Sequence, residues 1–198
     1  QGHRLRRQAD DQGVGQVGAE RLFRERGYKA TTIRDITAAA GVSVGSVMLL
    51  GDKRALLIAM FDRLIADVHR RRAAHDGPAT SGDADASTAD KLVGLVMPFL
   101  EIFSAHSDLA REYAAALVSG THASVVFNEL GAALIAEIES VLTGDGTPPA
   151  RVPGVARAIY LSYLGILFEW ASSGDTDISR PLRNLHLVLN SLIDPKEA

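Results

Sequence analysis

The side chains that most often carry out catalysis are present in this chain, but they do not stand at catalytic spacing. The six histidines show neither the paired spacing of zinc ligands nor an H-E-x-x-H motif, and there is no cysteine. No G-x-S-x-G motif and no glycine-rich phosphate loop occurs. Glu137 and Glu139 stand two residues apart and so face different sides of a helix, where we expect surface charges. The sequence therefore predicts no metal site, no cofactor and no enzyme activity.

Capping signals in the first third of the chain predict a helix-turn-helix. Thr32 followed by Asp35 resembles a capping box that opens a short helix, and Gly41 ends that helix. Ser43 is placed to cap the next short helix, and Asp52 to cap a long one. A glycine turn followed by a capped helix with small residues is what a DNA-reading helix needs to approach the groove.

The second short helix carries apolar side chains where a base-reading helix usually carries polar ones. No Arg, Asn or Gln, the side chains that discriminate bases most sharply, occurs between Val42 and Leu50. Val44 and Val47 are instead expected to contact thymine methyl groups. Leu50 is expected to pack in the core beneath the long helix.

The charge is distributed unevenly along the chain. Residues 1–72 hold fourteen Lys and Arg against eight Asp and Glu, a net charge of +6, so the other 126 residues carry −9 within the total of −3. A basic N-terminal part joined to an acidic remainder indicates an anionic partner for the first part, with ordinary surface charge as the alternative. Arg70–Arg72 are expected to be the solvated end of the long helix.

Nearly all of the chain is predicted to be helical, because apolar residues recur at a spacing of three and four and no sustained alternation occurs. The first helix should end at Gly27. It should become regular only from about residue 17, because Gly13, Gly15 and Gly18 are costly inside a helix. The long helix should run over about residues 53–75.

The later helices are separated by loops at 76–88 and 143–154, which are rich in Gly, Pro and Asp. Pro98 should kink the helix that follows the first loop, and Pro181 should be a first residue of the last helix. The last two helices are expected to pair, with outward apolar residues that face another subunit: Tyr160, Leu167, Val188 and Ile193.

The apolar stretches are too short for a bilayer. The longest one at helical spacing spans residues 158–168, whereas a membrane helix needs about 20. The chain also opens with no secretory signal. We expect no membrane segment and a cytoplasmic location.

Residues 17–57 contain several short motifs in a fixed order: Leu22-Phe23, Arg26-Gly27-Tyr28, Thr31-Thr32-Ile33-Arg34-Asp35-Ile36, Ala40-Gly41-Val42-Ser43, Gly45-Ser46 and Lys53-x-Ala55-Leu56. Together they resemble the N-terminal domain of the tetracycline-repressor (TetR) family of transcriptional regulators. The resemblance implies an all-α fold of about nine helices. It implies a three-helix helix-turn-helix DNA-binding domain at residues 1–52 and a helical effector-binding and dimerisation domain at 53–198.

The resemblance implies binding to double-stranded DNA. Val44 stands where the family commonly has Lys, Met48 where it has Tyr, and the segment before Lys53 is one residue short. These departures keep open an alternative, a TetR-like ligand- or protein-binding regulator whose DNA reading is weakened or lost. The residues expected at the DNA are Arg4, Arg6 and Arg7 as a flexible arm, with Thr32, Arg34, Ser43, Val44, Gly45, Ser46, Met48 and Lys53.

The resemblance also implies a homodimer, formed through the last two helices, that a small molecule releases from DNA. This protein would be a one-component regulator, a repressor, with a small and mostly apolar effector because few charges are available in the body. The polar groups expected to orient the effector are His69, His122, Glu101 and Tyr113. The residues expected to line its site are Leu64, Val68, Met97, Phe99, Phe103, Tyr113, Leu117, His122, Phe127, Tyr163 and Trp170.

Overall fold

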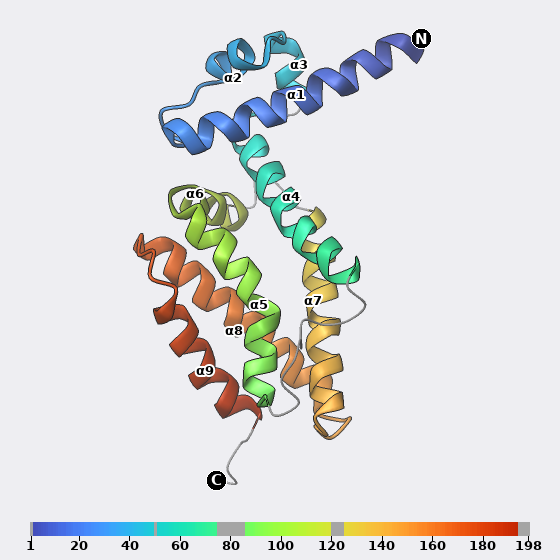
Figure 1. Cartoon of the computed structure of the whole chain (residues 1–198), viewed down its shortest axis with the longest axis vertical. Helices are drawn as coiled ribbons and strands as arrows, with labels where there is room; N and C mark the ends of the chain where they lie inside the picture. Colours follow the sequence, from blue (N-terminus) through green and yellow to red (C-terminus); the bar gives the residue numbers. More distant parts are fainter. Residues whose placement is uncertain (1, 50, 75–85, 120–124, 194–198) are drawn as a thin grey trace. The chain divides into compact units, whose positions relative to one another are not determined.

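The computed structural model describes residues 2–49, 51–74, 86–119 and 125–193, with the backbone alone for 2–12, 73 and 125–127. Within these ranges the chain forms nine α-helices and no strand, which confirms the all-α prediction (Figure 1). The helices are α1 (Gly2–Arg26), α2 (Ile33–Ala40), α3 (Val44–Met48), α4 (Lys53–Ala74), α5 (Thr88–Ala105), α6 (Ser107–Val118), α7 (Val125–Gly144), α8 (Val152–Ser173) and α9 (Ser179–Ile193).

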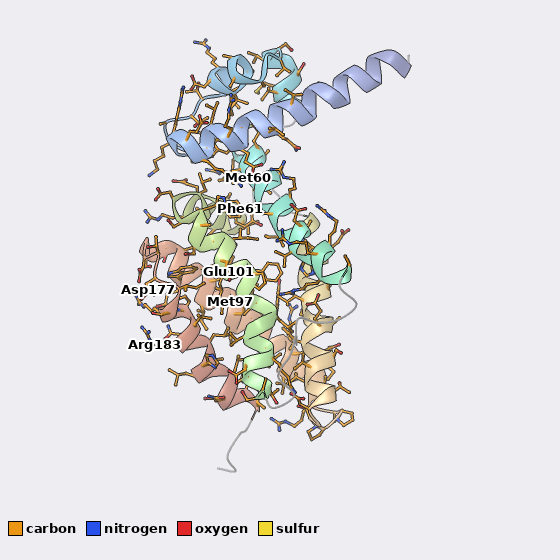
Figure 2. The ribbon with its side chains drawn as sticks, viewed as in Figure 1. Met60, Phe61, Met97, Glu101, Asp177 and Arg183 are labelled. Carbon is orange, nitrogen blue, oxygen red and sulfur yellow. The ribbon has the colours of Figure 1, made fainter. Side chains whose placement is uncertain are left out.

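The helices form two compact units. Unit 1 comprises residues 1–64 and 108–124, and unit 2 comprises 65–107 and 125–198. The boundary predicted after residue 52 thus falls inside unit 1. The reason is that the first half of α4 belongs to the core of unit 1, where the ring of Phe61 stacks on that of Tyr113 from α6 at 4.4 Å. Figure 2 labels Phe61 on α4.

In unit 1, α2 and α3 lie along α1 (Figure 1). Their shared core contains Leu22, Phe23, Ile36 and Val47, all almost fully buried. The close approach of α1 and α2 depends on Gly18, because a Cβ there would lie 3.2 Å from the Cβ of Ala40. Packing of one helix on another therefore favours a glycine that helix propensity alone disfavours.

The start of α1 differs from the expectation. The helix begins at Gly2 rather than near residue 17. Gly15 and Gly18, two of the glycines expected to be costly in this helix, are buried in unit 1, so the contacts of the folded chain offset their low helix propensity. The predicted flexible arm accordingly has a helical backbone.

The predicted caps are present. Thr32 and Asp35 form a capping box, and Gly41 follows α2 with a φ of 67°, in the left-handed region that favours glycine. The Ser43 hydroxyl accepts from the backbone N–H of Ser46 at 3.0 Å, and the Asp52 carboxylate accepts from that of Ala55 at 2.9 Å. One backbone N–H in the first turn of each of α2, α3 and α4 is satisfied in this way.

In unit 2, α8 packs on α7 and α9, and α5 packs on α7 and α9. The apolar residues of α5 that recur at a spacing of three and four are buried: Leu92, Leu95, Val96, Phe99 and Phe103. Pro98 lies inside the helix without ending it. The last helix begins at Ser179, so Pro181 is its third residue. Its start is held by Asp177, whose carboxylate accepts from the Ser179 N–H at 2.9 Å, and by Arg183, which donates to the Ser179 hydroxyl at 3.0 Å (Figure 2).

Most of the loop predicted at 76–88 lies outside the described residues, as does Leu50. No single helix of the described chain is both long and apolar enough to cross a membrane.

Candidate functional site

The α2–turn–α3 segment of unit 1 exposes polar side chains on α2 and apolar side chains on α3. Thr32 caps α2, and its hydroxyl donates to the Asp35 carboxylate at 2.7 Å while accepting from the Asp35 N–H at 3.2 Å. The hydrogen bonds from Thr32 lower the pKa of the Asp35 carboxyl. Thr32 is therefore held in a fixed position at the start of α2, and Arg34 in the first turn of this helix is exposed.

The α3 outer face consists of Val44, Gly45, Met48 and Leu49, all exposed. Half or more of the side chain is accessible at Val44 (50%), Met48 (53%) and Leu49 (60%). Val47 does not belong to this face. It is fully buried, because one side of so short a helix must pack on α1 and α2, so the expected contact between Val47 and a thymine methyl is wrong.

Lys53 is engaged with the loop between α1 and α2. Its ammonium donates to the carbonyl oxygens of Tyr28 at 3.0 Å and Thr31 at 2.9 Å. The same ammonium lies 4.2 Å from the centroid of the Tyr28 ring, a cation–π distance. This side chain holds the start of α4 to the loop between α1 and α2, which its spacing in the sequence did not indicate.

The remaining predicted DNA contacts are Arg4, Arg6 and Arg7. Their backbone belongs to α1, and their side chains lie outside the described residues.

A cavity of about 40 Å³ lies within unit 2 and opens partly to solvent. Of the predicted effector residues, it brings together Phe99, Phe103 and Tyr163. Almost all of its surface is apolar, because leucine and aromatic side chains from four helices meet there. The full lining is Ile65, His69, Phe99, Phe103, Leu130, Gly131, Leu134, Tyr160, Tyr163, Leu164 and Leu167.

Two of the lining residues, Tyr160 and Leu167, were expected to face another subunit. They are instead buried, with exposed fractions of 8% and 2%. Together with Tyr163 and Leu164 they form one helical stripe on α8 at a spacing of three and four, which is the signal that identifies them as inward-facing. The exposed apolar side chains of the last two helices are Leu161 and Leu187.

The other predicted effector residues do not line this cavity. Leu64, Tyr113 and Leu117 belong to unit 1, where Tyr113 is fully buried against Phe61. Val68, Met97 and Trp170 lie in unit 2, and Trp170 borders a smaller pocket between α8 and α9.

Of the polar groups expected to orient a ligand, only some lie at the cavity. Glu101 is exposed on α5 (Figure 2), while His69 lines the cavity. His122 and the side chain of Phe127 lie outside the described residues.

A buried polar cluster adjoins His69. Arg72, whose side chain is 9% exposed, donates to the Glu137 carboxylate at 2.8 Å and to the carbonyl oxygen of Leu95. The Nδ1 atom of His69 lies 3.4 Å from the same carboxylate. Arg72 and Glu137 were expected to be solvated. They are paired because α4, α5 and α7 pack together in unit 2 around these two side chains.

The electrostatics of this cluster favour the ion pair. Burial alone would raise the pKa of the Glu137 carboxyl, but the hydrogen bond from His69 and the charge and hydrogen bond of Arg72 together lower it. Burial also raises the pKa of the nearby Tyr163 hydroxyl, which therefore stays neutral. The Nε of Arg72 is buried and has no hydrogen-bond partner within the described chain.

The fold and these sites define a class: a helical protein with an N-terminal helix-turn-helix and a separate helical body that encloses an apolar cavity. Residues 17–60 match the profile of a family described as bacterial regulatory proteins, tetR family. This range contains α2 and α3 entirely. No curated protein sequence matches the chain.

Several solved structures have a similar fold. One is Thermus thermophilus FadR, a TetR-family transcriptional repressor in complex with lauroyl-CoA, at 21% identity and a TM-score of 0.65 over 94% of this chain and 95% of that one. Another is the fatty acid degradation regulator FadR from Bacillus halodurans, at 18% identity and 0.61 over 89% and 93%. A third is a TetR variant from Acinetobacter baumannii AYE in complex with minocycline, at 21% and 0.56 over 91% and 93%.

Residues 17–60 thus match the profile of the tetR family, and the fold of the described chain is similar to that of TetR-family regulators of known structure.

Proposed function

We propose that this protein is a cytoplasmic one-component repressor that binds operator DNA as a homodimer and is released by a small, mostly apolar effector. The observation that carries the proposal is the tetR-family domain at residues 17–60, in which a capped α2 and α3 present an exposed outer face. The exposed cations of this domain, among them Arg34, supply the charge that attracts a DNA backbone.

Selection of genomic fragments by the purified protein tests the DNA-binding part. A repressor enriches defined fragments, and its affinity for them falls steeply with salt and exceeds its affinity for random DNA. Binding that is equally weak on every sequence contradicts the proposal.

The effector site is proposed to be the cavity in unit 2. Its apolar lining suits an apolar ligand, and His69 offers one hydrogen-bonding group at its wall. About 40 Å³ holds only a few water-sized groups, so an effector must enlarge this space. The similar structures that contain lauroyl-CoA and minocycline support a ligand in a body of this fold.

Release from DNA is proposed to pass through α4. This helix supplies Ile65 and His69 to the cavity, and its earlier residues Leu56 and Leu57 belong to the core of unit 1. An effector that binds more tightly to one position of α4 shifts the protein toward that conformer. In that conformer, the two α3 helices of the dimer no longer match successive major grooves, which are about 34 Å apart.

A cavity-filling variant tests this site. Leu130→Trp places a large side chain in the lining of the cavity, whereas Ala133→Trp changes an exposed position three residues along α7. Screening of apolar compounds by thermal shift should find ligands for the native protein and for the Ala133→Trp control, but not for Leu130→Trp. Equal ligand binding by both variants contradicts the assignment.

The dimer is proposed to form through α8 and α9, around Leu161 and Leu187. These are 51% and 68% exposed, and each stands in the middle of the exposed stripe of its helix. Leu187→Glu should yield a monomer in sedimentation experiments, because a carboxylate would be buried in the interface. Val118→Glu, on an apolar residue of α6 that is 75% exposed, is the matched control and should stay dimeric.

The alternative is a ligand- or protein-binding regulator with little DNA reading. Two observations favour it: the α3 outer face carries no polar base-reading side chain, and Lys53 is bonded to backbone carbonyls. The fragment selection separates the two functions, since only a DNA reader enriches particular sequences.

A further inference from the structure

The chemistry of the α3 outer face restricts what it can recognise. Val44, Met48 and Leu49 offer only hydrocarbon and a thioether, and Gly45 between them offers no side chain. A face of this kind cannot donate a hydrogen bond from a side chain to a base edge. It can only contact apolar groups.

The hydroxyl groups next to this face are committed to the turn. The Ser43 hydroxyl accepts from the Ser46 N–H and is bonded to the Ser46 hydroxyl at 3.0 Å. The next cation along the chain, Lys53, is bonded to Tyr28 and Thr31. The polar groups near α3 therefore hold the local structure in place.

The groups that distinguish base pairs in the major groove are hydrogen-bond donors, hydrogen-bond acceptors and one apolar group, the C5 methyl of thymine. We propose that Val44 and Met48 of the α3 outer face determine operator specificity by contacting thymine methyl groups. This inference rests on the proposed DNA-binding function and specifies the chemistry by which that function discriminates sequences.

The net charge of the domain that carries this face argues for DNA as its occupant. The exposed residues of unit 1 within the tetR-family domain include Arg21, Arg26, Lys29, Arg34 and Arg54. A second copy of this chain would bring the same positive charges to the contact, whereas a DNA backbone brings the opposite charge. Residues 17–60 hold seven Lys and Arg against four Asp and Glu, a net charge of +3, so an apolar face on this domain fits a groove lined by phosphates.

The test begins with the DNA sequence selected by the purified protein. Each thymine of this duplex is replaced, one at a time, by deoxyuridine, which removes the methyl group and keeps every hydrogen-bonding group. Affinity is measured by fluorescence anisotropy at one salt concentration. At the positions beneath α3 we expect a loss of about fourfold for each methyl, the size associated with one buried methyl-sized group.

Variants identify the side chain responsible. Val44→Ala and Met48→Ala should each abolish the deoxyuridine effect at one position, and both changes are on exposed residues that the fold does not need. Arg34→Ala is the control. It should weaken binding to all duplexes alike and keep the deoxyuridine effect.

The outcomes separate this inference from the function on which it rests. If the selected duplex binds tightly and no thymine replacement changes its affinity by more than about twofold, the methyl readout is wrong and DNA binding stands. If no sequence is selected, the proposed function fails and the inference fails with it. If Met48→Ala reduces self-association and leaves DNA affinity unchanged, the face is a contact between copies and the inference is overturned.

Discussion

The ammonium of Lys53 lies 4.2 Å from the centroid of the Tyr28 ring and donates a hydrogen bond to the carbonyl oxygen of the same residue at 3.0 Å. A second hydrogen bond, to Thr31, completes the attachment of α4 to the loop that precedes α2. One cation thus joins the start of α4 to the loop between α1 and α2 within unit 1. Replacing Lys53 should therefore lower the free energy of unfolding of unit 1.

Lys53→Ala should lower the free energy of unfolding by about 1 to 3 kcal/mol, because two carbonyl oxygens lose a charged donor and Tyr28 loses its cation. Urea unfolding followed by circular dichroism measures the loss. Arg34→Ala, at an exposed position, should stay within about 0.5 kcal/mol of the native protein. Unchanged stability together with weaker binding to every DNA sequence would instead identify Lys53 as a phosphate contact.

Glu137→Ala should destabilise unit 2 by about 3 kcal/mol, because it leaves the buried charge of Arg72 without its partner. The fluorescence of Trp170, the single tryptophan and 5% exposed, reports the unfolding of this unit. Replacing both charges, as in Arg72→Met with Glu137→Leu, should cost less than Glu137→Ala alone. A double variant less stable than the single one would contradict this account.

The stability of unit 2 should fall in acid partly through Glu137. Its pKa in the folded protein lies below the ordinary value of 4.5, so its ion pair contributes fully above that pH. The contribution is lost as the pH falls through the lowered pKa. Urea unfolding between about pH 6 and 3 should therefore show a shallower decline for Glu137→Gln than for the native protein. Glu139→Gln, two residues along α7, should keep the native slope.

Gly131→Ala should be destabilising by about 1 to 2 kcal/mol, although alanine is the better helix former. A Cβ at this position would lie 2.4 Å from the hydroxyl oxygen of Tyr160, so the tyrosine must move and the cavity must change shape. Gly144→Ala on the same helix meets nothing within 4 Å and should be neutral or slightly stabilising. Thermal unfolding of the two variants gives the comparison, and equal melting temperatures would show that Tyr160 adapts without cost.

The sequence alone determined the local features of this protein. The capping box of Thr32 and Asp35, the glycine stop at Gly41 and the apolar stripe of α5 were all predictable. Each depends on residues within one or two helical turns, and the chemistry of caps and apolar periodicity acts over that range. The family resemblance was likewise contained in one contiguous segment.

The tertiary structure decided which side chains meet. Arg72 and Glu137 are 65 residues apart, and only the packing of α4 and α7 in unit 2 turns two expected surface charges into a buried ion pair. Lys53 bonds to Tyr28 across 25 residues, and Tyr160 faces a cavity rather than a second subunit. Helical periodicity shows that a residue has an apolar neighbour somewhere, but which helix supplies that neighbour depends on the free energy of packing the whole unit.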